Sequence, residues 1–384
     1  MSKKQAIQKA LEHHQAGRLN QAEAIYQRIL KKEPNHPDAL HLAGVLAHQS
    51  GKNEEAITLI RQAISYRNAF PEAYCNLGNI LKRQGELTEA MSCYHEAIAL
   101  KPNLVGAHNN LGNIQRELGQ LDQAMSSYQQ VLAYKPGHAE AHYNLAITSK
   151  ELGKLGEAVD NFRQAITLKP GVAEQHFNLA NVLASIGKTD EAMMQLRQAI
   201  SIKPDYVDAY INLGVLLHKQ GNLQLAIETY QKILSYNSNC AAAYCNLGSV
   251  FSELGKFDEA ITVYRQAIES DSRLAEAYYN LGNALQIRGK SYEASQAHLQ
   301  ALSIKPDYRD AHNNLGNILQ AQGMLDAAET HLKQAQILDP DSADSYNNLG
   351  NVYKHQSQLS EAITCYRQAL KLKPEYFDAH SNLL

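Results

Sequence analysis

Asparagine recurs at two fixed positions along the chain, three residues apart. The first row repeats every 34 residues and holds Asn76, Asn110, Asn144, Asn178, Asn212, Asn246, Asn280, Asn314, Asn348 and Asn382. The second row holds Asn79, Asn113, Asn181, Asn283, Asn317 and Asn351. A primary amide offers a donor and an acceptor together, which complements the C=O and N–H groups of a peptide unit. The two rows therefore predict a surface that binds the backbone of an extended peptide.

The same asparagines could instead bond to the neighbouring repeat. Residues three apart share one face of a helix, so both rows are expected to face the same way. One neutral hydrogen bond contributes only about 0.5–1.5 kcal/mol net, so peptide affinity would come from several repeats together. For a single asparagine the two roles stay open, whereas the doubled row as a whole favours binding.

Acidic side chains form a third row, one turn before the first asparagine row. Acids in the first turn of a helix stabilise its dipole, and we favour that role for most of them. Contacts with hydroxyl or basic groups of a bound peptide are the alternative. The row comprises Asp38, Glu72, Glu140, Glu174, Asp208, Glu276, Asp310, Asp344 and Asp378, of which the last five are candidate secondary peptide contacts.

The predicted peptide-binding surface becomes less polar in its middle repeats. Tyr143, Phe177, Ile211 and Tyr279 stand at the position that asparagine occupies in other repeats. These side chains could line an apolar pocket or simply pack locally, and the sequence leaves both possibilities open.

A 34-residue period underlies all of these rows. A turn glycine recurs ten times, from Gly17 to Gly323, and only Ser357 breaks the series. Alanine follows five residues later in every repeat, and proline closes most repeats. Glycine can end a first helix in the left-handed conformation, and proline stops the second helix. The period therefore predicts an all-α, right-handed solenoid superhelix of helix-turn-helix units.

The period also sets the predicted unit boundaries. Eleven units span 3–376, and a twelfth begins in 377–384. The eleven are 3–36, 37–70, 71–104, 105–138, 139–172, 173–206, 207–240, 241–274, 275–308, 309–342 and 343–376.

Composition limits the cellular location and the classes of partner that we expect. No window holds the long apolar run of a membrane span, and the first residues lack the apolar core of a signal peptide. Five cysteines without a Cys-x-x-Cys pair are typical of a reducing compartment. A net charge of −3 gives no basic footprint for nucleic acid. We expect a cytoplasmic protein, or a nucleocytoplasmic one in a eukaryote, with no membrane and no nucleic-acid partner.

Other motifs do not predict chemistry. Gly187-Lys188-Thr189 and Gly289-Lys290-Ser291 end like a phosphate loop, but Val182 and Ala284 stand where its first glycine is needed. Five histidines replace the tyrosine of other repeats and are expected to pack like aromatic side chains: His108, His142, His176, His312 and His380. We expect no catalytic residue, no metal site and no cofactor in this chain.

The repeat resembles the tetratricopeptide repeat (TPR). One unit carries that signature in Tyr74, Leu77, Gly78, Gly85, Ala90, Tyr94, Ala97 and Pro102. The Asn-Leu-Gly-Asn units and the segment 370–383 further resemble the N-terminal repeats of bacterial-type protein O-linked N-acetylglucosamine (O-GlcNAc) transferases. That resemblance implies a superhelix that guides extended protein segments to a C-terminal glycosyltransferase domain using UDP-GlcNAc. Ala146 and Ala180 in place of glycine, and Val215 and Ser249 in the second row, depart from the pattern.

The expected partners are extended or disordered protein segments. A stand-alone scaffold that assembles a protein complex is the alternative to the glycosyltransferase arm. Whether a catalytic domain follows Leu384, and whether two chains form a homodimer, stay open. A clamp for C-terminal carboxylates is rejected because Cys75, Asn109 and Tyr143 stand where it needs lysine or arginine.

Overall fold

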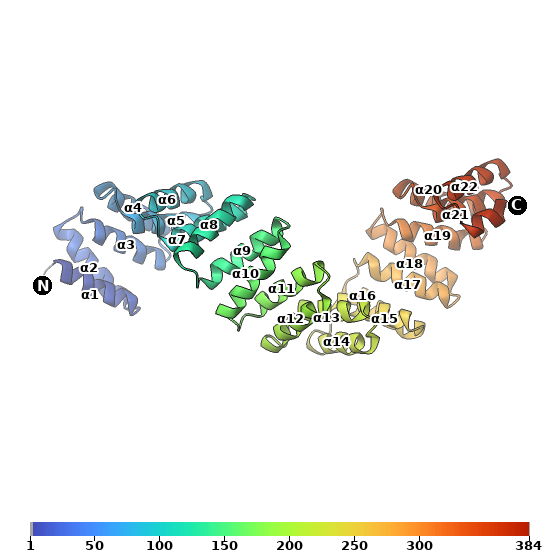
Figure 1. The fold of residues 1–384 in the computed structure, drawn as a ribbon, viewed down its shortest axis with the longest axis horizontal. Helices are drawn as coiled ribbons and strands as arrows, with labels where there is room; N and C mark the ends of the chain where they lie inside the picture. Colours follow the sequence, from blue (N-terminus) through green and yellow to red (C-terminus); the bar gives the residue numbers. More distant parts are fainter. Residues whose placement is uncertain (1–2, 384) are drawn as a thin grey trace. The chain divides into compact units, whose positions relative to one another are not determined.

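The computed structural model describes residues 3–383, which fold into 23 helices with no strand among them (Figure 1). The chain divides into two compact units, residues 1–202 and 203–384. The first unit contains α1 (Lys3–Gln15), α2 (Leu19–Lys32), α3 (Pro37–Gln49), α4 (Asn53–Tyr66), α5 (Pro71–Gln84), α6 (Leu87–Leu100), α7 (Val105–Glu117), α8 (Leu121–Tyr134), α9 (Ala139–Glu151), α10 (Leu155–Leu168), α11 (Ala173–Ser185) and α12 (Thr189–Ile202). The second contains α13 (Val207–Lys219), α14 (Leu223–Tyr236), α15 (Ala241–Glu253), α16 (Phe257–Ser270), α17 (Ala275–Ile287), α18 (Ser291–Ile304), α19 (Arg309–Ala321), α20 (Leu325–Leu338), α21 (Ala343–His355), α22 (Leu359–Leu372) and α23 (Phe377–Leu383).

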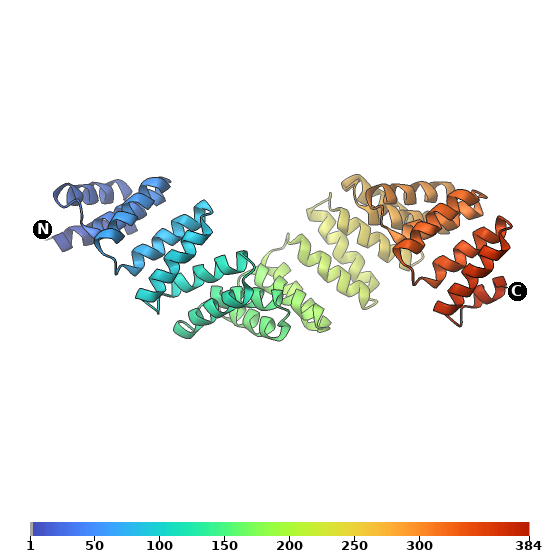
Figure 2. The same ribbon diagram turned by 90° about the horizontal axis from the view of Figure 1, so that it is seen from above.

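Helices within each unit pack in sequence order. Each odd-numbered helix pairs with the even-numbered helix that follows it, and the even-numbered helix also packs on the first helix of the next hairpin in the same unit (Figure 2). First helices of neighbouring hairpins touch as well, as α3, α5, α7 and α9 do in turn. The predicted all-α solenoid is confirmed: α1 to α22 form eleven hairpins, and α23 begins a twelfth.

The turns use glycine in the way the sequence predicts. Ten turn glycines have φ between +73° and +85°, the left-handed region that favours glycine. Ser357 stands at the same place in its turn and adopts φ +61°, a conformation that costs energy for a residue with a Cβ.

The core of each hairpin depends on small residues opposite large ones. The recurring alanine of the second helix is 0–2 % exposed in all eleven repeats, from Ala22 to Ala362. Gly112 of α7 lies against the Tyr128 ring of α8, and a Cβ on that glycine would stand 2.7 Å from Tyr128 Cε1. The same contact joins Gly78 to Tyr94 and Gly248 to Tyr264. These glycines allow the two helices to approach closely.

The five recurring histidines do more than pack. Each places its ring Nε2 close to the carbonyl of the proline six residues earlier: the distance is 2.8 Å for His108 and Pro102, and 3.0 Å for His312 and Pro306. Because a carbonyl oxygen only accepts, the imidazole donates this hydrogen bond. The prediction of aromatic-like packing missed the bond, which holds the loop between hairpins.

Two further points concern the terminal residues and the prediction that no helix spans a membrane. Residues 1 and 2, which precede the first predicted unit, and residue 384, the last of the predicted twelfth unit, lie outside the described residues. Within residues 3–383, none of the helices combines the length and the apolar character that crossing a membrane requires.

Adding a methyl group at a helix–helix contact should destabilise the array. For Gly112→Ala we expect a loss of about 1–3 kcal/mol, because the new Cβ collides with the Tyr128 ring. Gly156→Ala is the matched control: Gly156 lies in α10, and no heavy atom lies within 4 Å of the position that its Cβ would take, so the change should be neutral or stabilising. Urea unfolding followed by circular dichroism measures both, and equal stability of the two variants would contradict the packing argument.

Relieving the strained turn should stabilise the chain. Ser357→Gly is expected to add up to about 1 kcal/mol, because glycine adopts positive φ without the Cβ penalty. The reverse change, Gly323→Ser, puts the same strain into the preceding turn, where φ is +74°, and should lower the melting temperature. Melting temperatures that move in the same direction for both variants would refute this interpretation of the turn.

Candidate functional site

The sixteen predicted asparagines all lie on first helices. Those described here are carried by α5, α7, α9, α11, α13, α15, α17, α19, α21 and α23. Since first helices of successive hairpins contact one another within a unit, the amides of one hairpin face those of the next. Most of these side chains are partly exposed, and Asn144 is buried.

Hydrogen bonds join the two rows to each other. The Nδ2 of Asn110 donates to Oδ1 of Asn79 at 2.7 Å, which links α7 to α5. Asn144 donates to Asn113 at 3.0 Å, and Asn314 donates to Asn283 at 2.8 Å, in the same manner. A first-row asparagine of one hairpin therefore holds the second-row asparagine of the preceding hairpin.

Other first-row asparagines reach a different side chain of the preceding hairpin. The Nδ2 atoms donate from Asn76 to His41 (2.8 Å), from Asn178 to Tyr143 (2.9 Å), from Asn280 to the Cys245 sulfur (3.8 Å), from Asn348 to Asn313 (3.1 Å) and from Asn382 to Asn347 (3.1 Å). Burial lowers the pKa of His41 to about 4, which keeps its ring neutral and able to accept from Asn76. The sequence left two roles open for each asparagine. In these repeats the side-chain nitrogen of the first-row asparagine bonds to the neighbouring repeat, which is one of those roles.

Tyrosines of the second helices hold the second row. The hydroxyl groups of Tyr94 and Tyr128 donate to Oδ1 of Asn79 and Asn113, at 2.8 and 2.7 Å, and Tyr366 donates to Asn351 at 2.8 Å. Burial raises the pKa of Tyr128 to about 12, so the hydroxyl stays a donor at neutral pH. The sequence signal, a tyrosine fifteen residues after the asparagine, was present and was missed.

Between α5 and α7 this network leaves one amide acceptor and one amide donor. The Oδ1 of Asn79 accepts from both Tyr94 and Asn110, which turns its Nδ2 away from them. The Nδ2 of Asn110 points at Asn79, and among residues 3–383 nothing donates to the Asn110 oxygen. An amide oxygen from the first row and an amide nitrogen from the second therefore face outward together.

The remaining asparagines differ. Asn246 has no side-chain hydrogen bond within residues 3–383, since Ile211 and Val215 stand at the two acceptor positions of the preceding hairpin. Asn317 likewise has none in the described part, whereas Asn181 and Asn212 do interact with other groups of the chain.

The acidic row is largely paired within the protein. Arg67 contacts Asp38 through two hydrogen bonds of 2.7 and 2.8 Å and lowers the pKa of that carboxyl group. Lys101 pairs with Glu72 at 2.8 Å. Of the five candidate contacts, Asp310 pairs with Arg309 and Asp344 lies near the Tyr376 hydroxyl. The other three, Asp208, Glu276 and Asp378, are exposed.

The tyrosines of the middle repeats take part in hydrogen bonding. The Tyr143 hydroxyl donates to Glu174 at 2.7 Å and accepts from Asn178. Tyr279 packs its ring 4.8 Å from that of Tyr308, centroid to centroid. These two side chains are therefore parts of the packing between hairpins.

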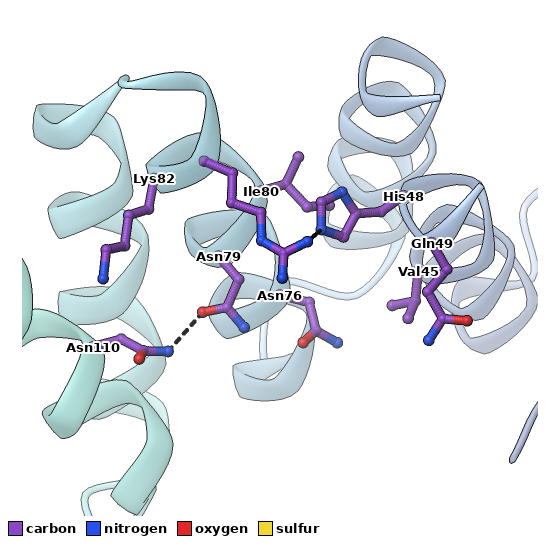
Figure 3. Close-up of a pocket in the computed structure, with 9 residues that line it drawn as sticks. Val45, His48, Gln49, Asn76, Asn79, Ile80, Lys82 and Asn110 are labelled. Atoms are coloured by element: carbon purple, nitrogen blue, oxygen red, sulfur yellow. Dashed lines mark hydrogen bonds between the residues drawn. The ribbon is translucent and has the colours of Figure 1, made fainter. Parts of the chain in front are cut away.

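An open pocket of about 550 Å³ lies beside three of the predicted asparagines (Figure 3). Its lining comes from α3, α5 and α7 and comprises Val45, His48, Gln49, Asn76, Asn79, Ile80, Lys82, Arg83 and Asn110. The sequence prediction did not include the basic residues of this pocket, because a Lys-Arg pair stands at these two repeat positions only once, although single cations recur there, as at Arg116 and Lys150. Within residues 3–383 the structure contains no group of three or more His, Cys, Asp or Glu side chains placed to hold a metal ion.

Models of one repeat family match most of the chain. The model described as "TPR repeat" matches residues 46–85, 78–119, 112–149, 180–221 and 248–289. Models described as "Tetratricopeptide repeat" match residues 139–171, 207–240, 275–308 and 307–375. No curated protein matches the sequence significantly.

Several solved structures resemble the chain. The structure of YrrB, described as a TPR protein with an unusual peptide-binding site, is 25% identical and covers 49% of this chain and 98% of its own, with a TM-score of 0.44. Cut9–Hcn1, a hetero-tetramer of APC/C, covers 100% of this chain and 96% of its own at 13% identity and a TM-score of 0.51. PilF of Pseudomonas aeruginosa covers 54% and 95% at 20% identity and a TM-score of 0.50.

At these identities, the likeness to Cut9–Hcn1 and PilF concerns the fold alone. The repeat-family models, the eleven helical hairpins and the 34-residue period agree with one another. The chain belongs to the tetratricopeptide-repeat proteins.

Proposed function

We propose that this repeat array binds extended peptide segments along its first helices, with the asparagine rows holding the peptide backbone. Membership of the tetratricopeptide-repeat family supports a role as a protein-interaction scaffold. The observation that carries the finer proposal is the outward pair of amide groups, the oxygen of Asn110 and the nitrogen of Asn79.

The pairing suits a peptide because a backbone unit also presents one donor and one acceptor. Asn79 cannot turn freely, since Tyr94 and Asn110 both hold its oxygen. A side chain that is already fixed loses little conformational entropy on binding, which favours affinity. The Asn113 oxygen is held in the same way by Tyr128 and by the buried Asn144, which fixes a second amide nitrogen one hairpin later.

The peptide-binding surface would serve a protein glycosyltransferase. The Asn-Leu-Gly-Asn units resemble the repeats that select substrates in protein O-GlcNAc transferases, and the amide rows supply the sequence-tolerant binding that such a role requires. In this proposal the array presents extended segments to a catalytic domain elsewhere in the full-length protein. A scaffold that assembles a complex uses the same surface without that domain.

Removing three first-row amides from the part of the chain formed by residues 203–384 should weaken peptide binding. For Asn280→Ala, Asn314→Ala and Asn348→Ala together we expect a loss of affinity of roughly tenfold or more, because each bond contributes about 0.5–1.5 kcal/mol. Fluorescence anisotropy with a capped, labelled peptide of repeated Gly-Ser-Asn measures the affinity, and circular dichroism checks the fold.

A matched control replaces three asparagines outside the first helices. Asn161, Asn222 and Asn237 each make a side-chain hydrogen bond, and their triple change to alanine should leave affinity unaltered. If the Asn280→Ala, Asn314→Ala, Asn348→Ala variant binds the peptide as tightly as the wild type, the asparagine rows have a purely structural role.

The glycosyltransferase assignment has its own test. The protein expressed from its complete coding region should transfer GlcNAc from UDP-GlcNAc to serine or threonine of an unstructured protein, and mass spectrometry detects the added sugar. Peptide binding without any transfer would support the scaffold and reject the glycosyltransferase.

A further inference from the structure

The pocket between α3, α5 and α7 differs in charge from the rest of the chain. Its lining holds two cationic side chains, Lys82 and Arg83, and no carboxylate. The whole chain carries a net charge of −3, so this local excess of positive charge runs against the overall balance. Figure 3 shows Lys82 extending on the same side as Asn79 and Asn110.

Neither cation is neutralised by an acidic partner. Lys82 forms no ion pair within residues 3–383, and Glu117, which stands in the next hairpin where a pairing acid would be expected, does not line the pocket. One hairpin further on the arrangement differs: Arg116 is paired with Glu151, at 3.4 Å. The two charges of the pocket are therefore available to a ligand.

His48 orients the Arg83 guanidinium instead of neutralising it. The Nδ1 of His48 lies 2.7 Å from Oδ1 of Asn53, an oxygen that only accepts, so the ring proton sits on Nδ1. The Nε2 atom is then free to accept from Arg83 Nη1 at 3.0 Å. This bond uses one face of the guanidinium and leaves its other N–H groups available to a ligand.

The neighbouring amide adds donors of the same kind. The Oδ1 of Asn79 accepts from Tyr94 and Asn110, so the group that Asn79 offers to the pocket is its NH₂. Lysine, arginine and an amide nitrogen donate hydrogen bonds, and carboxylate oxygens accept them. Donors from three side chains thus surround one partly enclosed space.

The chain contains a neutral version of this site six repeats later. A pocket of about 200 Å³ there is lined by Asn280, Asn283 and Ile287, among others. Asn314 donates to Asn283 at 2.8 Å, which reproduces the bond from Asn110 to Asn79. Gln286 and Ile287 stand at the positions of Lys82 and Arg83. The amides are common to both sites, and the cations are present in only one.

We propose that the pocket formed by α3, α5 and α7 binds the carboxylate of an aspartate or glutamate side chain in an extended peptide, through Lys82, Arg83 and the Asn79 amide. This inference rests on the proposed peptide-binding function and adds a preference for acidic segments at this part of the array. Charge-assisted hydrogen bonds to a carboxylate are stronger than neutral ones, so the pocket selects by charge where the other amides do not.

The test compares two capped, labelled peptides, one of repeated Gly-Ser-Asp and one of repeated Gly-Ser-Asn. The wild-type chain should bind the acidic peptide roughly five- to tenfold more tightly, which is the range of two partly exposed ion pairs. The preference should shrink as salt is raised, because partly exposed charges are screened.

The variant Lys82→Gln with Arg83→Ile gives this pocket the residues of its neutral counterpart. We expect the preference for the acidic peptide to disappear while affinity for the neutral peptide and the melting temperature stay unchanged. The reciprocal variant, Gln286→Lys with Ile287→Arg, should increase the preference by creating a second basic pocket.

The outcomes separate this inference from the proposed function. Tight binding of both peptides with equal affinity would overturn the acidic preference and leave backbone recognition standing. A preference that persists in the Lys82→Gln, Arg83→Ile variant would assign it to other residues and overturn the pocket. Binding of the acidic peptide alone, abolished in that variant, would support the pocket and count against recognition of the backbone by the asparagine rows.

Discussion

The close approach of two helices at glycine is the constraint on which the rest of this structure depends. Gly78 and Gly112 each face a buried tyrosine ring at a distance that leaves no room for a Cβ. Because the ring is held there, its hydroxyl reaches the asparagine that follows the glycine: Tyr94 bonds to Asn79, and Tyr128 to Asn113. The packing of the core therefore sets the orientation of the second-row amides, and a change in that packing disturbs them.

Some repeats lose both parts of this arrangement, and others lose only one. Phe162 has no hydroxyl, and Ile147 replaces the asparagine that would accept from it. At Val215 the asparagine is lost but the tyrosine remains, and within residues 3–383 the buried Tyr230 hydroxyl has no partner. An unpaired buried hydroxyl costs free energy, so this hairpin is held by its apolar contacts. The helical packing therefore tolerates gaps in the polar network, which leaves the groove residues free to vary.

The sequence predicted the fold well because a period is a one-dimensional signal. Turn glycines, buried alanines and closing prolines act within one repeat, so their positions alone imply the hairpins. The helix face of the asparagines followed from their spacing of three. Their partners did not follow, because a bond such as Asn110 to Asn79 depends on the distance and angle between two repeats. Those quantities come from side-chain packing, which the spacing does not encode.

The basic pocket was missed for a related reason. A period emphasises residues that recur, whereas the pocket depends on an adjacent Lys-Arg pair that stands at these repeat positions only at Lys82 and Arg83. An amide row that recurs in many hairpins can hold a backbone at many registers, so by itself it gives affinity without selection. A pocket with two cations and no acidic partner, such as that of Lys82 and Arg83, restricts the register of whatever lies along the row, because alignments that bring a carboxylate to it are favoured. In such an array the recurring residues supply the surface, and specificity resides in the departures from the repeat.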